Sequence, residues 1–133
     1  MSQENLELAR RAYEAFNRGD LDGMVTDFAS TFEYVPTGAI PGAGDAYRGA
    51  EGWKEFVAWF MSEFENRRVE VRELTEAGDH VLASLTLRGR GKQSGAEASW
   101  DVWHVWTVRD GKFVHGQGFA RSDEALEAAR LSE

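Results

Sequence analysis

The alternation of large apolar and polar residues is clearest between residues 100 and 119, WDVWHVWTVRDGKFVHGQGF. Two runs rich in β-branched and aromatic residues flank Asp110 and Gly111, a pair that tolerates the positive φ angles of a tight type I′ turn. This pattern predicts a β-hairpin, in which successive side chains point to opposite faces.

Centring the turn on Asp110 and Gly111 assigns each hairpin residue to a face. On one face, large residues on the first strand stand opposite glycines on the second strand: Trp103 opposite Gly118, and Val105 opposite Gly116. Something must fill the space above the glycines, and we interpret this face as the wall of a pocket. The alternative is that the glycines only let the rings lie flat or let the sheet bend.

Earlier in the chain, apolar residues recur every three or four positions, which predicts helices. The first helix is expected at about residues 3–18, and the third at about residues 50–65. Between them, Asp20 is expected to cap a short second helix that turns Leu21, Met24, Val25 and Phe28 inward. A last short helix is expected to start at Ser122.

Strands are predicted at residues 32–35, 68–76 and 81–90, ahead of the hairpin. Helices followed by mostly antiparallel strands indicate an α+β fold, in which a curved sheet wraps around the N-terminal helices. With 133 residues, we expect one domain spanning residues 1–133.

Composition narrows the function classes. The net charge is -8 and no basic cluster occurs, which argues against binding to nucleic acid or to anionic membranes. No apolar run approaches the length of a membrane helix, and the N-terminus lacks the apolar core of a signal peptide, so we expect a cytoplasmic protein.

Cysteine is absent, which excludes disulfides and thiolate chemistry. No two of the three histidines have ligand spacing on one element, so we expect no metal and no other cofactor. His80, in a predicted turn, is expected at the surface.

Three segments resemble the SnoaL-like branch of the NTF2-like superfamily. They are FNRGDLDGMVTDFA, the YRGAEGW that precedes the aromatic third helix, and the terminal WTVRDGKFVHGQGFARSDEALEAARL. The resemblance implies a cone-shaped α+β barrel with a deep pocket between the concave sheet and the helices, commonly in a homodimer. Members of this superfamily include ketosteroid isomerases, polyketide cyclases, epoxide hydrolases, dehydratases and non-catalytic binding proteins, so the fold alone does not decide the function.

The resemblance also allows the ketosteroid isomerase mechanism to be tested by position. That mechanism needs a tyrosine on the first helix, a base near the end of the first strand and a protonated Asp on a hairpin strand. These positions fall at Ala12, at Val35 or Pro36, and at Trp103. Because all three groups are missing, we do not expect steroid isomerase activity.

Two functions remain open. The first is a binding protein for an apolar or aromatic small molecule. Its pocket walls would be Tyr13, Phe16, Phe28, Tyr34, Trp53, Phe56, Phe60, Trp103 and Val105.

The second function is a lyase, isomerase or cyclase that uses Asp101 as its acid or base, because Asp101 is the only carboxylate that the alternation places on the pocket side of the hairpin. The alternative is that Asp101 is solvated or paired with Arg88. A third possibility is a dimer whose cone is filled by its own side chains.

The opposite face of the hairpin predicts a homodimer. The residues expected at this interface are Trp100, His104, Trp106, His115 and Phe119. A patch so rich in aromatic residues is unusual on a monomer. The assignment depends on the register, because a one-residue bulge at Gly111 would move His115 and Gln117 to the pocket side while His104 stayed outside.

Overall fold

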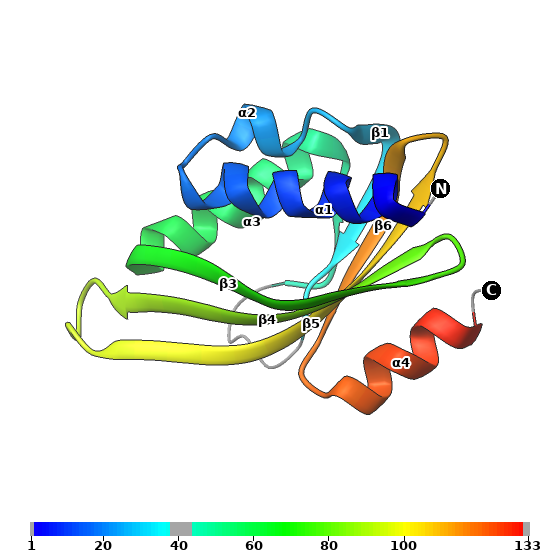
Figure 1. Ribbon diagram of the computed structural model, residues 1–133. Helices are drawn as coiled ribbons and strands as arrows, with labels where there is room; N and C mark the ends of the chain where they lie inside the picture. The colour runs from blue at the N-terminus through cyan, green and yellow to red at the C-terminus, as the bar shows by residue number, and fades with distance from the viewer. Residues whose placement is uncertain (1, 38–43, 132–133) are drawn as a thin grey trace.

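The computed structural model describes residues 2–37 and 44–131 and shows an α+β fold, as predicted. Three helices lie over one face of a curved sheet: α1 (Ser2–Asn17), α2 (Leu21–Met24) and α3 (Gly49–Glu63) (Figure 1). A fourth helix, α4 (Ser122–Leu131), lies on the opposite side. We call the face toward α1–α3 the inner face and the face toward α4 the outer face.

The described sheet has six strands. They are β1 (Phe28–Val35), β2 (Tyr47–Arg48), β3 (Phe64–Ala77), β4 (His80–Gly91), β5 (Glu97–Arg109) and β6 (Lys112–Phe119). Their order is β2-β1-β6-β5-β4-β3, and only the β1–β6 pair is parallel. The sheet is therefore mixed, with the hairpin of β5 and β6 near its centre.

The second helix is shorter than the sequence predicts. Asp20 caps α2 as expected, because its carboxylate accepts a hydrogen bond from the backbone N–H of Gly23 at 2.9 Å. The helix nevertheless ends at Met24, and Phe28 begins β1 instead of continuing the helix. Pairing with β6 explains the difference, because Phe28 is the register partner of Phe113.

The hairpin forms at the predicted place, and both Asp110 and Gly111 have positive φ angles. Its register is correct only next to the turn, where Val108 pairs with Phe113. A bulge at Val114 then shifts the second strand by one residue, so that Thr107 pairs with His115. The predicted pairs beyond this point are therefore wrong.

The predicted faces are wrong as well. Trp103 and Val105 lie on the outer face, where they pack in a cluster with Ala125 and Ala129 of α4. Val102, His104 and Trp106 point inward, toward α1 and α3. Both faces of β5 carry large apolar residues, so alternation alone could not decide which face the N-terminal helices cover.

This correction affects the predicted interface. His104 and Trp106 are only 5% and 2% exposed on the inner face, and the ring of Trp100 contacts Phe60 and Phe64. His104 and Trp106 are thus buried within the protomer, whereas Trp100 remains partly exposed. His115 and Phe119 do lie on the outer face, because they pair with the outward-facing Thr107 and Trp103.

His80 is also corrected, since it is buried rather than at the surface. Its Nδ1 lies 3.1 Å from the hydroxyl of Thr107.

None of the described helices is both long and apolar enough to cross a membrane.

The gap above the glycines exists, but on the inner face. Trp106 is paired with Gly116, and a Cβ atom added at Gly116 would overlap Cζ3 and Cε3 of the indole ring. The ring therefore fills the space that the missing side chain leaves. Around it pack Phe32 and Tyr34 of β1, both nearly parallel to the indole plane.

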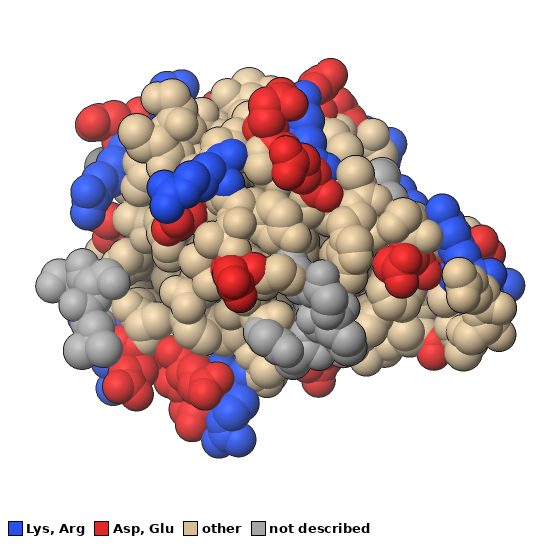
Figure 2. Space-filling view, turned by 180° about the vertical axis from the view of Figure 1, so that it is seen from behind, with Lys and Arg blue, Asp and Glu red and all other residues tan. Residues whose placement is uncertain are grey.

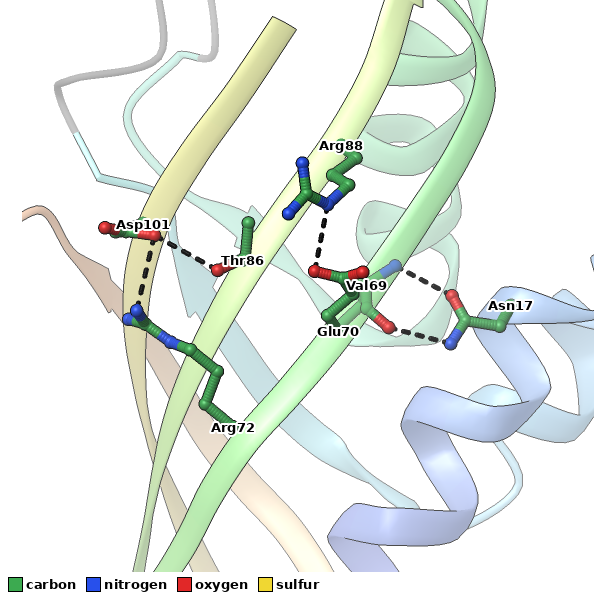
Figure 3. A network of polar contacts seen from close by, with 7 residues as sticks. All are labelled: Asn17, Val69, Glu70, Arg72, Thr86, Arg88 and Asp101. Carbon is green, nitrogen blue, oxygen red and sulfur yellow. Dashed lines mark hydrogen bonds and ion pairs between the residues drawn. The ribbon is translucent and has the colours of Figure 1, made fainter.

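Helix α1 is fixed to the edge of the sheet by one side chain. The Asn17 amide donates to the carbonyl of Val69 at 2.9 Å and accepts from its N–H at 2.8 Å (Figure 3). These bonds satisfy both backbone groups of one residue of the edge strand β3. Tyr13 lies one helical turn before Asn17 and is thereby held over the inner face.

We predict that Gly116→Ala destabilises the fold by about 1–3 kcal/mol, because the added methyl group must displace a buried indole ring. Urea unfolding of the variant and the wild type measures this cost. In a Trp106→Phe background the same change should cost less, because the smaller ring leaves room for the methyl group. Equal costs in the two backgrounds would contradict the proposed overlap.

Candidate functional site

An apolar cavity lies between α1, α3 and the inner face of the sheet. Its walls come from helices and strands that are far apart in the sequence. The lining residues are Tyr13, Phe16, Met24, Tyr34, Trp53, Phe56, Val57, Phe60, Val69, Leu87, Val102 and His104. None of these residues is Asp, Glu, Lys or Arg.

The cavity is small. The centre of a water-sized sphere can occupy about 40 Å³ of it. This space is enough for a few waters, because one water needs roughly 10–15 Å³ by this measure. A ring-sized ligand therefore requires some of the lining side chains to move.

Three polar side chains meet at the cavity, and we call Tyr13, Tyr34 and His104 the polar cluster. The imidazole of His104 lies between the two tyrosines, with Nδ1 at 2.7 Å from the Tyr13 hydroxyl and Nε2 at 3.1 Å from the Tyr34 hydroxyl. The indole N–H of Trp106 donates to the Tyr13 hydroxyl at 2.6 Å. The cluster thus joins α1, β1 and β5.

Burial keeps the polar cluster uncharged. It lowers the pKa of His104 to about 3, so the imidazole is neutral at physiological pH. Burial also raises the pKa of Tyr13 well above its ordinary value, although the hydrogen bond from Trp106 acts in the opposite direction. Tyr34 is likewise shifted upward by burial.

Among the hydrogen bonds between described residues, those of the cluster leave one hydrogen unused. A neutral imidazole carries one N–H. The three bonds therefore have four hydrogens available: the Trp106 N–H, the His104 N–H and the hydroxyl hydrogens of Tyr13 and Tyr34. If Tyr13 donates to Nδ1, then Nε2–H donates to Tyr34 and the Tyr34 hydrogen remains. In the other tautomer, Tyr34 donates to Nε2, Nδ1–H donates to Tyr13, and the Tyr13 hydrogen remains.

Of the nine residues predicted to line a pocket, the structure brings six together around this cavity. They are Tyr13, Phe16, Tyr34, Trp53, Phe56 and Phe60. Phe28 packs behind the cavity wall against Trp53 and Phe32. Trp103 and Val105 face away, for the reason given above. A binding role for any of these residues stays a prediction.

Asp101 lies outside the cavity, which corrects its predicted placement. Its carboxylate is on the outer face, with 58% of the side chain exposed, and lies 3.5 Å from the guanidinium of Arg72. It also accepts a hydrogen bond from the Thr86 hydroxyl at 3.1 Å (Figure 3). Arg88, the alternative partner considered from the sequence, pairs instead with Glu70.

Sequence reasoning missed His104 as a site residue, because the pocket face of β5 was inferred from the glycines of β6. The bulge at Val114 places Gly116 and Gly118 opposite Trp106 and His104 instead. The three positions taken from the ketosteroid isomerase pattern were each one residue away from a cavity-lining side chain. Ala12 precedes Tyr13, Val35 follows Tyr34, and Trp103 precedes His104. Tyr13 carried a signal, because it falls on the inward stripe of α1 together with Phe16.

Within the described residues, no group of three His, Asp or Glu side chains is arranged to hold a metal ion.

On the side of the molecule seen from behind, charged residues of both signs lie in small groups around uncharged surface (Figure 2). In the described cavity, the hydrogen-bonding side chains are those of the polar cluster and the indole of Trp53.

Comparison with known proteins places this geometry in a family. The family model described as a SnoaL-like domain matches residues 9–116, a range that includes the whole polar cluster. No curated protein matches the chain at a significant level. The resemblance noted from the sequence is confirmed.

Solved structures show the same fold. TerC, co-crystallised with polyporic acid, is 27% identical, with 96% of this chain and 98% of TerC covered and a TM-score of 0.79. An NTF2-like protein from Burkholderia thailandensis is 26% identical, with coverages of 96% and 95% and a TM-score of 0.79. A hypothetical protein with a ketosteroid isomerase-like fold from Catenulispora acidiphila, in complex with trimethylamine, is 19% identical, with coverages of 93% and 92% and a TM-score of 0.76.

We predict that His104 makes the folded protein less stable in acid. In the unfolded chain the imidazole has an ordinary pKa near 6.5, whereas in the fold the pKa is about 3. Between these values the unfolded chain binds a proton that the folded chain does not, so stability falls as the pH falls below about 6.5, by about 1.4 kcal/mol per pH unit.

Comparison with a His104→Gln variant isolates this effect, because the other titrating groups are common to both proteins. The loss of unfolding free energy caused by the substitution should be about 2 kcal/mol smaller at pH 5 than at pH 7.5. Urea unfolding at the two pH values measures it. A loss that does not change with pH would show that His104 binds a proton equally in both states.

Proposed function

This chain belongs to the SnoaL-like domain family, and we propose that it binds an apolar or aromatic small molecule in the cavity between α1, α3 and the sheet. The observation that carries this proposal is the composition of the cavity wall: uncharged and mainly apolar residues surround one polar cluster. Binding sites for small molecules commonly combine an apolar wall with a few polar groups that orient the ligand.

The similarity to TerC supports a small-molecule ligand, without indicating its charge. TerC was co-crystallised with polyporic acid, it is 27% identical to this chain, and the alignment covers nearly all of both proteins. The other likenesses support the fold alone at lower identity.

The ligand would enter beside Phe16 and Leu87. Ten of the twelve lining residues are buried, whereas these two remain partly exposed. Leu87 is paired with Val69, and Val69 is bonded to Asn17, so the two partly exposed side chains lie near the C-terminal end of α1. Outward movement of these side chains would enlarge the cavity without breaking the polar cluster.

A second candidate function is proton-transfer catalysis, as in an isomerase, lyase or cyclase. The observation in its favour is the Tyr13 hydroxyl, which stays protonated and could donate to a substrate carbonyl oxygen as negative charge develops there. We do not assign this role to Asp101, because its carboxylate lies on the outer face beside the guanidinium of Arg72. His104 is a weak base, because burial lowers its pKa to about 3. The weakness of this base is why we favour binding over catalysis.

We predict that Val102→Ile weakens the binding of isopropylbenzene by at least about fivefold, because the added methylene occupies the small cavity. Titration of the purified protein, followed through the NMR signal of the Trp53 indole N–H, measures the affinity. Val71→Ile is the matched control, since Val71 is a strand valine that is 39% exposed and outside the cavity. The proposed function fails if isopropylbenzene does not bind or if Val102→Ile has no more effect than the control.

We also propose that two copies of the chain associate through the outer face of the sheet. Trp103, Gln117 and Phe119 lie on this face and are only partly buried within the protomer. A second copy would remove their apolar parts from water.

Sedimentation at low micromolar concentration should therefore show a dimer, and Trp103→Glu should shift it toward the monomer because it places a carboxylate in an apolar contact. A wild-type monomer would contradict the proposal. A Trp103→Glu dimer would place the interface elsewhere.

A further inference from the structure

The chemistry of the cavity wall restricts the charge of its ligand. Its twelve lining residues include no cationic and no anionic side chain. The hydrogen-bonding atoms of the lining side chains are the groups of the polar cluster and the indole N–H of Trp53, which donates to the sulfur of Met24 at 3.3 Å. A charged ligand would thus lose its water without gaining a charged partner.

We infer that the site selects uncharged ligands whose polar group is a hydrogen-bond acceptor, such as a ketone or ether oxygen, placed against the polar cluster. This inference rests on the proposed function and names the class of molecule that the same cavity takes. It follows from the charge of the wall and from the hydrogen count of the cluster.

Neither sign of charge can be matched within the cavity. An anion would need a cation, but burial keeps His104 neutral by lowering its pKa to about 3. A cation would need an anion, but burial raises the pKa values of Tyr13 and Tyr34, so both hydroxyls stay protonated. Burying an unpaired charge is far more costly than burying a neutral group of the same shape.

The preference for an acceptor follows from the unused hydrogen. Both nitrogens of His104 are engaged by the tyrosine hydroxyls, and in either tautomer one tyrosine hydrogen is left by the three bonds. Because both tyrosines line the cavity, a ligand oxygen can accept this hydrogen without disturbing the cluster. A purely apolar ligand offers no acceptor for this tyrosine hydrogen.

Four single-ring probes of nearly equal size test the inference: isopropylbenzene, acetophenone, benzoate and benzamidinium. They share the ring and differ in whether the three-atom substituent is apolar, a neutral acceptor, an anion or a cation. Titration of the wild-type protein at pH 7 should show that acetophenone binds at least about a hundredfold more tightly than either charged probe. The Val102→Ile and Val71→Ile pair shows for each probe whether it occupies the cavity.

The infrared carbonyl stretch of bound acetophenone tests the hydrogen bond directly. It should lie below the value for acetophenone in hexane, because a hydrogen bond to the oxygen weakens the C=O bond. A stretch equal to that in hexane would overturn the acceptor part of the inference. Cavity binding of benzoate or benzamidinium within tenfold of acetophenone would overturn the selection against charge.

These failures are distinguishable from failure of the proposed function. If isopropylbenzene binds in the cavity while the charged probes bind equally well, the apolar site stands and the selectivity is wrong. If isopropylbenzene does not bind at all, the proposed function fails and this inference fails with it.

Discussion

The contact between Trp106 and Gly116 is the constraint on which the site depends. Because Gly116 has no side chain, the indole ring can lie against β6, where it packs beside Phe32 and Tyr34. In this position its N–H points to the Tyr13 hydroxyl, which in turn lies 2.7 Å from His104. The absence of one methyl group thus sets the positions of hydrogen-bonding groups on two other elements.

Helix α1 enters this arrangement through two residues that are one turn apart. Asn17 fixes the helix to the edge strand, and Tyr13 connects it to the centre of the sheet through His104. Since Val69 and His104 lie on different strands, the two contacts together define where the helix lies across the sheet. The cavity beneath α1 and α3 is bounded by buried groups, apart from the partly exposed Phe16 and Leu87.

The sequence predicted the positions of the helices and strands better than the face of the sheet on which each side chain lies. Helical periodicity located α1 and α3, and Asp110 with Gly111 located the hairpin, because these signals depend on local chemistry. The bulge at Val114 has no comparable local signal, since Val114 fits a regular strand as well as a bulge. The extra residue places Gly116 and Gly118 opposite Trp106 and His104, so the glycines indicated the wrong face of β5 as the pocket side, and Asp101 was assigned to that face.

Tertiary contacts account for the other differences. Phe28 continues the apolar spacing of α2, yet its pairing with β6 places it in a strand. Six predicted pocket residues lie on α1, β1 and α3, where local periodicity was sufficient to identify the inward stripe. The two that face away, Trp103 and Val105, both lie on β5, where the assignment depended on the register.

Burying the polar cluster costs folding free energy, and this cost helps to decide between ligand binding and proton transfer as the function of the cavity. A buried hydroxyl hydrogen without an acceptor destabilises a fold by roughly 1–3 kcal/mol, whereas a buried group that is bonded costs little. The three bonds around His104 satisfy both imidazole nitrogens and the Trp106 N–H. They leave the hydrogen of one tyrosine hydroxyl without an acceptor within the cluster. An arrangement built for proton abstraction would instead hold a group whose pKa lies near neutral pH. Here burial moves the pKa of the imidazole far below that range, so the cluster is better suited to orienting a neutral ligand than to removing its proton.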